Sequence, residues 1–212
     1  MHTIEAYRDD ADEHYLREFR EAAARTISAR VPVRYRDAWP TVDEVRDWAC
    51  TLVAHAAGTG RGVCNIDSGR SLMLLGPIGT GKTYEAYGTV RLLAGSGASL
   101  GWRFITAADL YGQLRPRHGI DAESVFEVFA KTRFLVVDDL GAAKGSEWTE
   151  EINYRLVNHR YEHNRPTLIT SNVPPRELSA ALGERVASRL YEMADRVALK
   201  GADRRRASPP AA

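Results

Sequence analysis

Residues 76–83 have the residue types and spacing needed to hold a phosphate chain. Their sequence, Gly-Pro-Ile-Gly-Thr-Gly-Lys-Thr, fits the phosphate-binding loop pattern of a glycine, four residues and then Gly-Lys-Thr. Glycines let the backbone adopt positive φ and approach a phosphate closely, so that successive N–H groups meet the negative charge. Lys82 adds positive charge at the β- and γ-phosphates, and the Thr83 hydroxyl can ligate Mg²⁺. The residues expected to contact the nucleotide here are Gly76, Pro77, Gly79, Thr80, Gly81, Lys82 and Thr83.

Two adjacent acids follow the apolar run 134–137. Such a run indicates a buried strand of a parallel sheet, and ligands of open α/β sheets bind at the carboxyl ends of the strands. Asp138 and Asp139 are therefore expected to face the phosphate-binding loop. We predict that Asp138 holds Mg²⁺ through water and that Asp139 acts as the general base on the attacking water.

Two further stretches carry polar groups that could belong to the same site. Asn172 ends the stretch 166–172, which indicates another buried strand that ends in polar groups. Asn172 is expected to orient the hydrolytic water, although an asparagine can also simply close a strand. Arg185 and Arg189 are four residues apart in a predicted helix and therefore lie on one face of it. Their spacing predicts a shared face and no particular role.

A parallel sheet is needed to bring these groups together, and the chain has the segments to build it. An apolar run precedes the phosphate-binding loop, and a stretch with helical apolar spacing follows it. Strands then alternate with helices, which is typical of an α/β fold. We predict a three-layer α/β fold with a five-stranded parallel sheet. Strands are expected at 72–75, 100–106, 134–138, 166–172 and 196–199, and helices at 84–94, 107–114, 122–131, 148–163 and 182–190.

The composition favours one α/β domain with a short extension. The 212 residues contain 44% hydrophobic residues, enough for a core, and 29 basic against 28 acidic residues give a net charge of +1. This balance does not indicate a nucleic-acid or membrane partner. No apolar run is long enough for a bilayer and no secretory signal is visible, so a cytoplasmic location is expected. Cys50 and Cys64 lack metal or redox spacing and are expected to be reduced thiols.

The two ends of the chain are expected to lie outside the core domain. Residues 4–27 have apolar side chains at near-helical spacing, which predicts an amphipathic helix that either docks another protein or packs on its own domain. Two prolines, Pro32 and Pro40, then bound a linker. Thr41 and Glu44 have the spacing of a capping box ahead of the next helix. We predict an N-terminal arm at 1–30, a core domain at 31–206 and a disordered tail at 207–212.

Four motifs together resemble those of AAA+ ATPases of the DnaC/DnaI helicase-loader and IstB transposition-ATPase family. They are Leu-Leu-Gly-Pro-Ile-Gly-Thr-Gly-Lys-Thr, Val-Val-Asp-Asp-Leu-Gly, Leu-Ile-Thr-Ser-Asn and Leu-Gly-Glu-Arg-Val-Ala-Ser-Arg-Leu. The last is the most specific, because many P-loop proteins share the others. The resemblance covers residues 31–206 and implies an AAA+ domain of the ASCE type. Only about 35 residues follow Asn172 before the tail, too few for a C-terminal helical lid.

The resemblance also implies roles for polar residues late in the domain. Residues 170–172 would form sensor I, with Asn172 as the water-positioning residue. Arg189, supported by Arg185, would be the arginine finger that reaches the γ-phosphate bound by a neighbouring subunit. Arg205 (or Arg204) would be sensor II and contact the nucleotide.

A DNA contact is implied just after the acidic pair. Ser146 and Trp148 are candidates for binding single-stranded DNA, since an exposed tryptophan can stack on a base. The alternative for Trp148 is a core aromatic on its helix.

The sequence departs from the family's pattern in three places. Asp139 stands where many AAA+ proteins have glutamate, a shorter reach that allows slow hydrolysis. Tyr84-Glu-Ala replaces the more usual His-Leu-Ala after the phosphate-binding loop. The N-terminal arm has no Cys/His cluster, so it does not match the zinc-bearing helicase-binding domain of DnaI.

The function implied by the resemblance is binding and slow, assembly-dependent hydrolysis of ATP with Mg²⁺ by a helicase loader or DNA-replication accessory protein. Its expected partners are ATP, further copies of the chain, a replicative helicase and single-stranded DNA, with no membrane. One alternative is an IstB-like transposition helper that partners a transposase and duplex DNA. Another is a nucleotide-gated adaptor that binds ATP without hydrolysing it. The sequence does not separate these functions.

Overall fold

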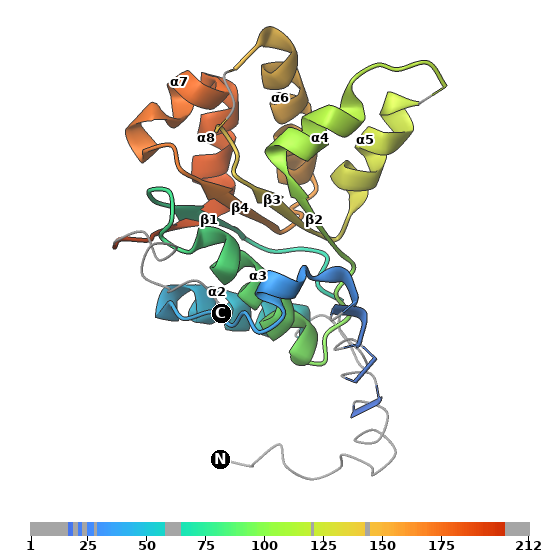
Figure 1. The fold of residues 1–212 in the computed structure, drawn as a ribbon, viewed down its shortest axis with the longest axis vertical. Coiled ribbons are helices and arrows are strands. Elements are labelled where there is room, and N and C mark those ends of the chain that lie inside the picture. The colour runs from blue at the N-terminus through green and yellow to red at the C-terminus, as the bar shows by residue number, and fades with distance from the viewer. Residues whose placement is uncertain are drawn as a thin grey trace, which may run out of the picture.

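The computed structural model describes residues 17–18, 21–22, 25–27, 29–57, 65–119, 121–142 and 145–201. Within these residues a five-stranded sheet lies between two layers of helices (Figure 1). The strand order is β2-β3-β4-β1-β5, and all four pairings are parallel. The predicted three-layer α/β architecture with five parallel strands is confirmed.

Helices connect the strands, as parallel pairing requires. The strands are β1 Ser71–Leu75, β2 Trp102–Thr106, β3 Phe134–Asp138, β4 Thr167–Ser171 and β5 Ala194–Ala198. The helices are α2 Asp43–Ala57, α3 Lys82–Gly95, α4 Ala107–Leu114, α5 Ala122–Lys131, α6 Glu147–Glu162, α7 Leu178–Leu182 and α8 Glu184–Met193, with short 3-10 helices η1 Val33–Tyr35 and η2 Pro175–Glu177.

Alternate side chains of the strands enter two separate cores, because successive residues of a strand point to opposite faces. In β1, Leu72 and Leu74 belong to the core under α2 and α3, whereas Met73 and Leu75 belong to the core under α4 to α8. Every residue of β1, β3 and β4 is buried. The central strands therefore read as continuous apolar runs because helices cover both of their faces.

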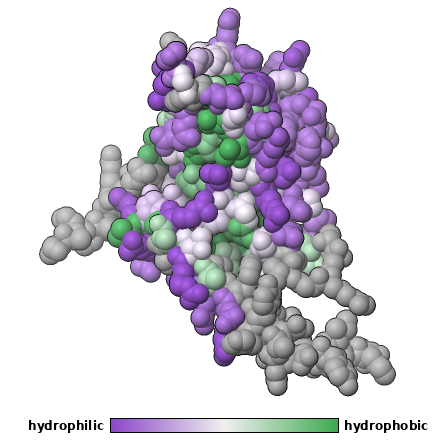
Figure 2. Space-filling view, turned by 90° about the vertical axis from the view of Figure 1, so that its right-hand side faces the viewer, coloured by the Kyte–Doolittle hydropathy of each residue, from purple (hydrophilic) through white to green (hydrophobic). Residues whose placement is uncertain are grey.

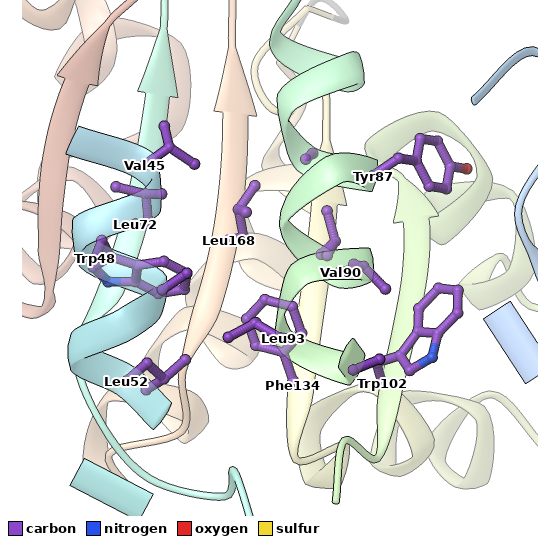
Figure 3. Close-up of a cluster of buried hydrophobic side chains, with 14 of the residues drawn as sticks. Val45, Trp48, Leu52, Leu72, Tyr87, Val90, Leu93, Trp102, Phe134 and Leu168 are labelled. Carbon is purple, nitrogen blue, oxygen red and sulfur yellow. The ribbon is translucent and has the colours of Figure 1, made fainter. Parts of the chain in front are cut away.

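The core under α2 and α3 contains the larger aromatic side chains (Figure 3). From α2, Val45, Trp48 and Leu52 lie three and four residues apart, so they form one apolar stripe toward the sheet. The indole of Trp48 lies 6.3 Å from the ring of Phe134 in β3, centroid to centroid. Val90 and Leu93 of α3 belong to the same core, so α3 is also packed on the sheet, directly after the phosphate-binding loop.

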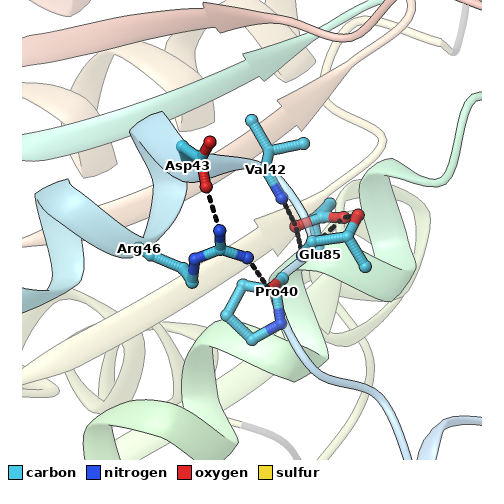
Figure 4. A network of polar contacts seen from close by, with 6 residues as sticks. Pro40, Val42, Asp43, Arg46 and Glu85 are labelled. Carbon is cyan, nitrogen blue, oxygen red and sulfur yellow. Dashed lines mark hydrogen bonds and ion pairs between the residues drawn. The ribbon is translucent and has the colours of Figure 1, made fainter.

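A buried carboxylate of α3 holds the segment that leads into α2 (Figure 4). Glu85 is fully buried and accepts hydrogen bonds from the Thr41 amide (2.9 Å), the Thr41 hydroxyl (2.5 Å) and the Val42 amide (3.4 Å). The hydroxyl expected to cap the helix thus binds Glu85, and α2 begins at Asp43. One turn further along α3, Gly88 makes room for this segment, since a Cβ there would lie 2.6 Å from the backbone of Pro40.

The end of the N-terminal arm packs on the core domain, while most of the predicted helix at 4–27 lies outside the described residues. Ile27 and Val31 are buried in the core under α2 and α3. The Arg30 guanidinium donates to the Trp102 carbonyl (3.0 Å) and lies 4.3 Å from the centre of the Trp102 ring. The boundaries predicted at 30/31 and 206/207 stay predictions, and the tail lies outside the described residues.

The described surface exposes few large apolar side chains. They are Val33, Trp39, Ile78 and Val128. The face in Figure 2 is accordingly mostly hydrophilic, with smaller apolar areas between the polar side chains. None of the described helices combines the length and the apolar character that a membrane span needs. Cys50 is exposed and unpaired, and Cys64 lies outside the described residues.

Candidate nucleotide-binding site

The loop between β1 and α3 is shaped by glycines at the carboxyl edge of the sheet. Gly81 is the N-cap of α3 and has a φ of 98°, a left-handed conformation that glycine adopts without strain. Gly76 passes close to the end of β5, where a Cβ would lie 2.3 Å from the Leu199 carbonyl oxygen. The first N–H groups of α3 have no helical carbonyl partner, so this helix end can bind an anion.

The ammonium group of Lys82 is held inside this loop. Its Nζ donates to the carbonyl oxygens of Gly76 (2.7 Å) and Pro77 (2.8 Å), and the residue is 8% exposed. The buried Thr80 hydroxyl also donates to Pro77 (2.9 Å). The loop is thus folded around a positive charge at the point where phosphates are expected to bind.

Asp138, at the end of β3, lies beside the first turn of α3. The Thr83 hydroxyl is 3.1 and 3.2 Å from its two carboxylate oxygens, and the Thr170 hydroxyl donates to Oδ1 at 2.6 Å. Burial raises the pKa of the Asp138 carboxyl above its ordinary value, the hydrogen bonds from Thr170 and Thr83 oppose this rise, and the charge of Asp139 adds to it. A buried carboxylate next to a hydroxyl is an oxygen donor set of the kind that Mg²⁺ prefers. The residues therefore fit the predicted magnesium site.

Asp139 is held in an uncommon backbone conformation. Its φ is 61°, in the left-handed region that few residues other than glycine enter. The Asp139 amide donates to the Thr170 hydroxyl (2.8 Å), the same hydroxyl that binds Asp138. Thr170 thus orients both acids, leaving the Asp139 carboxylate exposed at the pocket.

These groups line one cavity of about 600 Å³, large enough for a nucleotide. Its wall includes Gly79, Gly81, Lys82 and Thr83 from the loop and the first turn of α3, together with Asp138, Asp139 and Asn172, which end or follow β3 and β4. The structure therefore brings together the loop, the acidic pair and the asparagine that the sequence placed in three separate segments.

Two residues of the linker also line the cavity, which the sequence did not indicate. They are Arg34 and Tyr35, from η1. The Tyr35 ring stacks on Tyr87 of α3 at 4.7 Å, and Tyr87 stacks on Phe104 of β2 at 3.9 Å, centroid to centroid. Burial and the nearby Asp138 carboxylate raise the pKa of Tyr87 to about 12, so this ring is neutral. The only signal in the sequence was a basic and an aromatic residue between two prolines.

The arginines of α8 do not belong to this cavity. Neither Arg185 nor Arg189 lines it among the described residues. Both guanidinium groups instead lie over tyrosine rings of α6. Arg204 and Arg205 lie outside the described residues.

The side chains predicted to bind DNA have other contacts. The Ser146 hydroxyl accepts from the Thr149 amide and caps α6, in a reciprocal capping box. Trp148 is half-buried, and its ring meets Tyr111 edge to face at 6.2 Å. These contacts favour the core alternative for Trp148, and the DNA-binding role of both residues stays a prediction.

Comparisons of the sequence point to one family. A family model described as "IstB-like ATP binding protein" matches residues 11–207. The IS5376 putative ATP-binding protein of Geobacillus stearothermophilus is 32% identical over 125 residues, which cover 57% of this chain and 47% of that protein. The replicative helicase loader DnaC of Escherichia coli K12 is 28% identical over 123 residues, covering 57% of this chain and 49% of DnaC. The aligned part spans about half the length of these relatives.

Solved structures share the architecture. A crystal structure of the DnaC helicase loader has a TM-score of 0.63 at 26% identity and covers 80% of this chain and 100% of the solved one. A crystal structure of DnaI also has a TM-score of 0.63, at 20% identity, with coverages of 82% and 94%. The fold is therefore the AAA+ P-loop fold of these proteins, as the motifs predicted.

Proposed function

The chain belongs to the family of IstB-like ATP binding proteins, and on this premise we propose that it hydrolyses ATP with Mg²⁺, slowly, at the carboxyl edge of its sheet. The observation that carries the proposal is the contact between Thr83 and Asp138, 3.1 Å apart, beside the phosphate-binding loop. A hydroxyl and a buried carboxylate at this separation are placed to share one divalent cation.

Each residue of the cavity has a part in this reaction. The amides of the loop and the Lys82 ammonium bind the β- and γ-phosphates. Thr83, and Asp138 through water, would hold Mg²⁺, which would supply positive charge at the phosphate oxygens. Asp139 accepts the proton of the attacking water, which Asn172 orients. Thr170 keeps both acids in place through its two hydrogen bonds.

A second copy of the chain completes the site. An arginine next to the transferred phosphate can raise turnover by roughly 10³ to 10⁵. Since neither Arg185 nor Arg189 lines the cavity of its own chain, we assign them to the γ-phosphate bound by a neighbour, with Arg189 as the finger. Arg205 is assigned to the nucleotide as sensor II. Hydrolysis then depends on assembly.

The partner of the assembled protein is a replicative helicase under the main proposal, with single-stranded DNA as a further ligand. The similarity to the replicative helicase loader DnaC supports it. A transposition helper is the second candidate, because the family model and the insertion-sequence relative favour it. Capture of a hexameric helicase, or of a transposase, by the ATP-loaded protein decides between them.

The dependence of turnover on protein concentration tests the shared site. ATPase activity per chain is expected to rise with concentration in the wild-type protein and to stay low at all concentrations in Arg189→Ala, while both bind ATP equally. An Arg189→Ala protein that binds ATP and keeps full turnover would contradict the assignment. A wild-type protein that binds ATP without turnover would make it a nucleotide-gated adaptor.

A further inference from the structure

Helices α6 and α8 pack against each other (Figure 1). The Arg189 side chain of α8 lies against two tyrosines of α6. Its guanidinium carbon is 5.1 Å from the centre of the Tyr154 ring and 5.8 Å from that of Tyr161. A cation within about 6 Å of an aromatic face is attracted by the ring. We call Tyr154 and Tyr161 the tyrosine cradle.

The cradle holds Arg189 without neutralising it. In the described part of the chain the guanidinium has no ion pair, its Nη1 donates to the Arg185 carbonyl at 3.3 Å, and its buried Nε has no hydrogen-bond partner. An arginine that serves only the fold normally has its donors satisfied, as those of Arg160 are. Arg189 is therefore oriented by ring faces, while its Nη2 group, for which the described residues offer no hydrogen-bond partner, and its charge remain available to another group.

The cradle itself is fixed in place. The Tyr161 hydroxyl donates to Glu192 of α8 at 2.7 Å, which ties the two helices together next to the arginine. Tyr154 packs against the core under α4 to α8. A long side chain that already lies on rigid rings loses less conformational freedom when it binds a ligand.

We propose that Tyr154 and Tyr161 are positioning residues that hold Arg189 ready to complete the nucleotide site of a neighbouring copy. The inference rests on the proposed function, because it takes Arg189 as the finger. It adds that α6, which contributes no residue to the nucleotide cavity described above, sets the rate of a neighbour's hydrolysis. Pre-organised charge is effective because no reorganisation is needed during the reaction.

Substitution of the rings provides the first test. With Tyr154→Leu and Tyr161→Leu together, turnover at saturating Mg²⁺ and ATP is expected to fall on the order of tenfold, with the dissociation constant of ATP unchanged. Tyr154→Phe keeps the ring and is expected to retain turnover. Tyr191→Leu is the matched control, since Tyr191 is also a half-buried tyrosine with an arginine over its ring. The guanidinium carbon of Arg196 lies 5.0 Å from the centre of that ring. It is expected to keep wild-type turnover.

A mixing experiment separates positioning from a general structural role. An Asp139→Asn chain lacks its general base but keeps Arg189 and the cradle, whereas the leucine double variant keeps its own base. When the two are mixed at constant total concentration, the ATPase activity is expected to exceed the sum of their separate activities several-fold. The reason is that the Asp139→Asn chain supplies its correctly held Arg189 to the nucleotide site of a neighbouring leucine variant, which has its own general base. The single variant Tyr154→Leu, tested in the same way, covers the case in which the double variant fails to fold.

Failure of this inference can be distinguished from failure of the proposed function. If Arg189→Ala loses turnover but the leucine variants do not, the cradle has no positioning role. Absence of any gain on mixing, or a Tyr154→Phe variant as slow as Tyr154→Leu, would also overturn the inference. If Arg189→Ala itself keeps full turnover, the finger assignment fails first.

Discussion

One charged side chain is buried at the amino ends of β3 and β4 and another at their carboxyl ends, and the two differ in their hydrogen-bond partners. At the amino ends, Arg160 is 1% exposed, and its guanidinium donates to the Thr167 hydroxyl and to backbone carbonyl oxygens. These are the carbonyls of Phe129, Ala130, Thr132, Arg133 and Pro166. At the carboxyl ends, Asp138 is 7% exposed, binds two hydroxyls and lies beside a second acid.

The difference separates a group that stabilises the fold from one that we propose helps to bind a cation. Burial lowers the pKa of Arg160 to about 9, and its hydrogen bonds to carbonyls keep it charged at neutral pH. Burial raises the pKa of Asp138, and the hydrogen bonds from Thr170 and Thr83 and the charge of Lys82 offset only part of this rise. A buried charge whose donors are all satisfied serves stability, whereas a buried carboxylate that lines a pocket beside a second acid is suited to a cation.

The largest effect is expected at the amino ends. Arg160→Met would leave buried carbonyl oxygens without donors and is expected to lower the free energy of unfolding by about 3–5 kcal/mol. In a domain of this size such a loss lowers Tm by about 6–20 °C. Thermal unfolding measures it, with Arg155→Met as the control. Arg155, on the same helix, is more exposed and pairs with Glu123 at the surface, so it is expected to cost no more than about 1 kcal/mol. If Arg160→Met and the wild-type protein had the same Tm, Arg160 would not stabilise the fold, and the comparison with Asp138 would fail.

The next effect is kinetic and concerns the carboxyl ends. Asp139→Asn is expected to lower turnover about 100-fold or more, because an amide cannot accept the proton of water. Stability and ATP affinity are expected to change little, since asparagine tolerates the left-handed backbone that Asp139 adopts. Phosphate release under saturating ATP is the measurement. Wild-type turnover in this variant would show that Asp139 is not the base.

The smallest effect has the opposite sign and sharpens the comparison most. Asp138→Asn removes a buried charge whose desolvation is only partly offset by its neighbours, and it is expected to raise the Tm of the protein without nucleotide at pH 7. A gain of 1 kcal/mol corresponds to ~2–4 °C in a domain of this size. Asp138→Asn is also expected to abolish the effect of Mg²⁺ on ATP binding. A lower Tm of the ligand-free variant would mean that Asp138 stabilises the fold as Arg160 does.

The difference in stability between Asp138→Asn and the wild-type protein is expected to depend on pH, because the pKa of Asp138 is raised in the folded state. A carboxyl whose pKa is higher in the folded state binds more protons there, so its contribution to stability is full below the unfolded pKa and is lost as pH rises through the folded pKa. The stability advantage of Asp138→Asn over wild type is therefore expected to grow from acidic to neutral pH. An advantage that is constant with pH would rule out titration of Asp138 as its cause.

Much of the fold could be predicted because the central strands carry apolar runs and the helices carry apolar stripes. The predictions at 107–114 and 122–131 coincide with α4 and α5. The prediction of the last strand was less accurate: it gave 196–199, whereas β5 is Ala194–Ala198. Helix α8 passes into β5 without a loop to mark the boundary. The cap expected at Thr41 was replaced by Glu85, a partner 44 residues away that only the tertiary fold brings near.

The site could be predicted where local pattern determines position. The loop at 76–83 and the acids after β3 carry their own strand signals, so their meeting at one edge follows from a parallel sheet. Arg34 and Tyr35 were missed because nothing in their own segment shows that α3 will draw them to the cavity. The tyrosine cradle was also missed, because its rings and its arginine lie on different helices.

Equilibrium binding of ATP with and without Mg²⁺ tests the central claim most directly. The account predicts that Mg²⁺ strengthens ATP binding to the wild-type protein, and that this gain disappears in Thr83→Val and Asp138→Asn while both variants remain folded. Failure of the wild-type protein to bind ATP in the presence of Mg²⁺, or an undiminished gain in both variants, would contradict it.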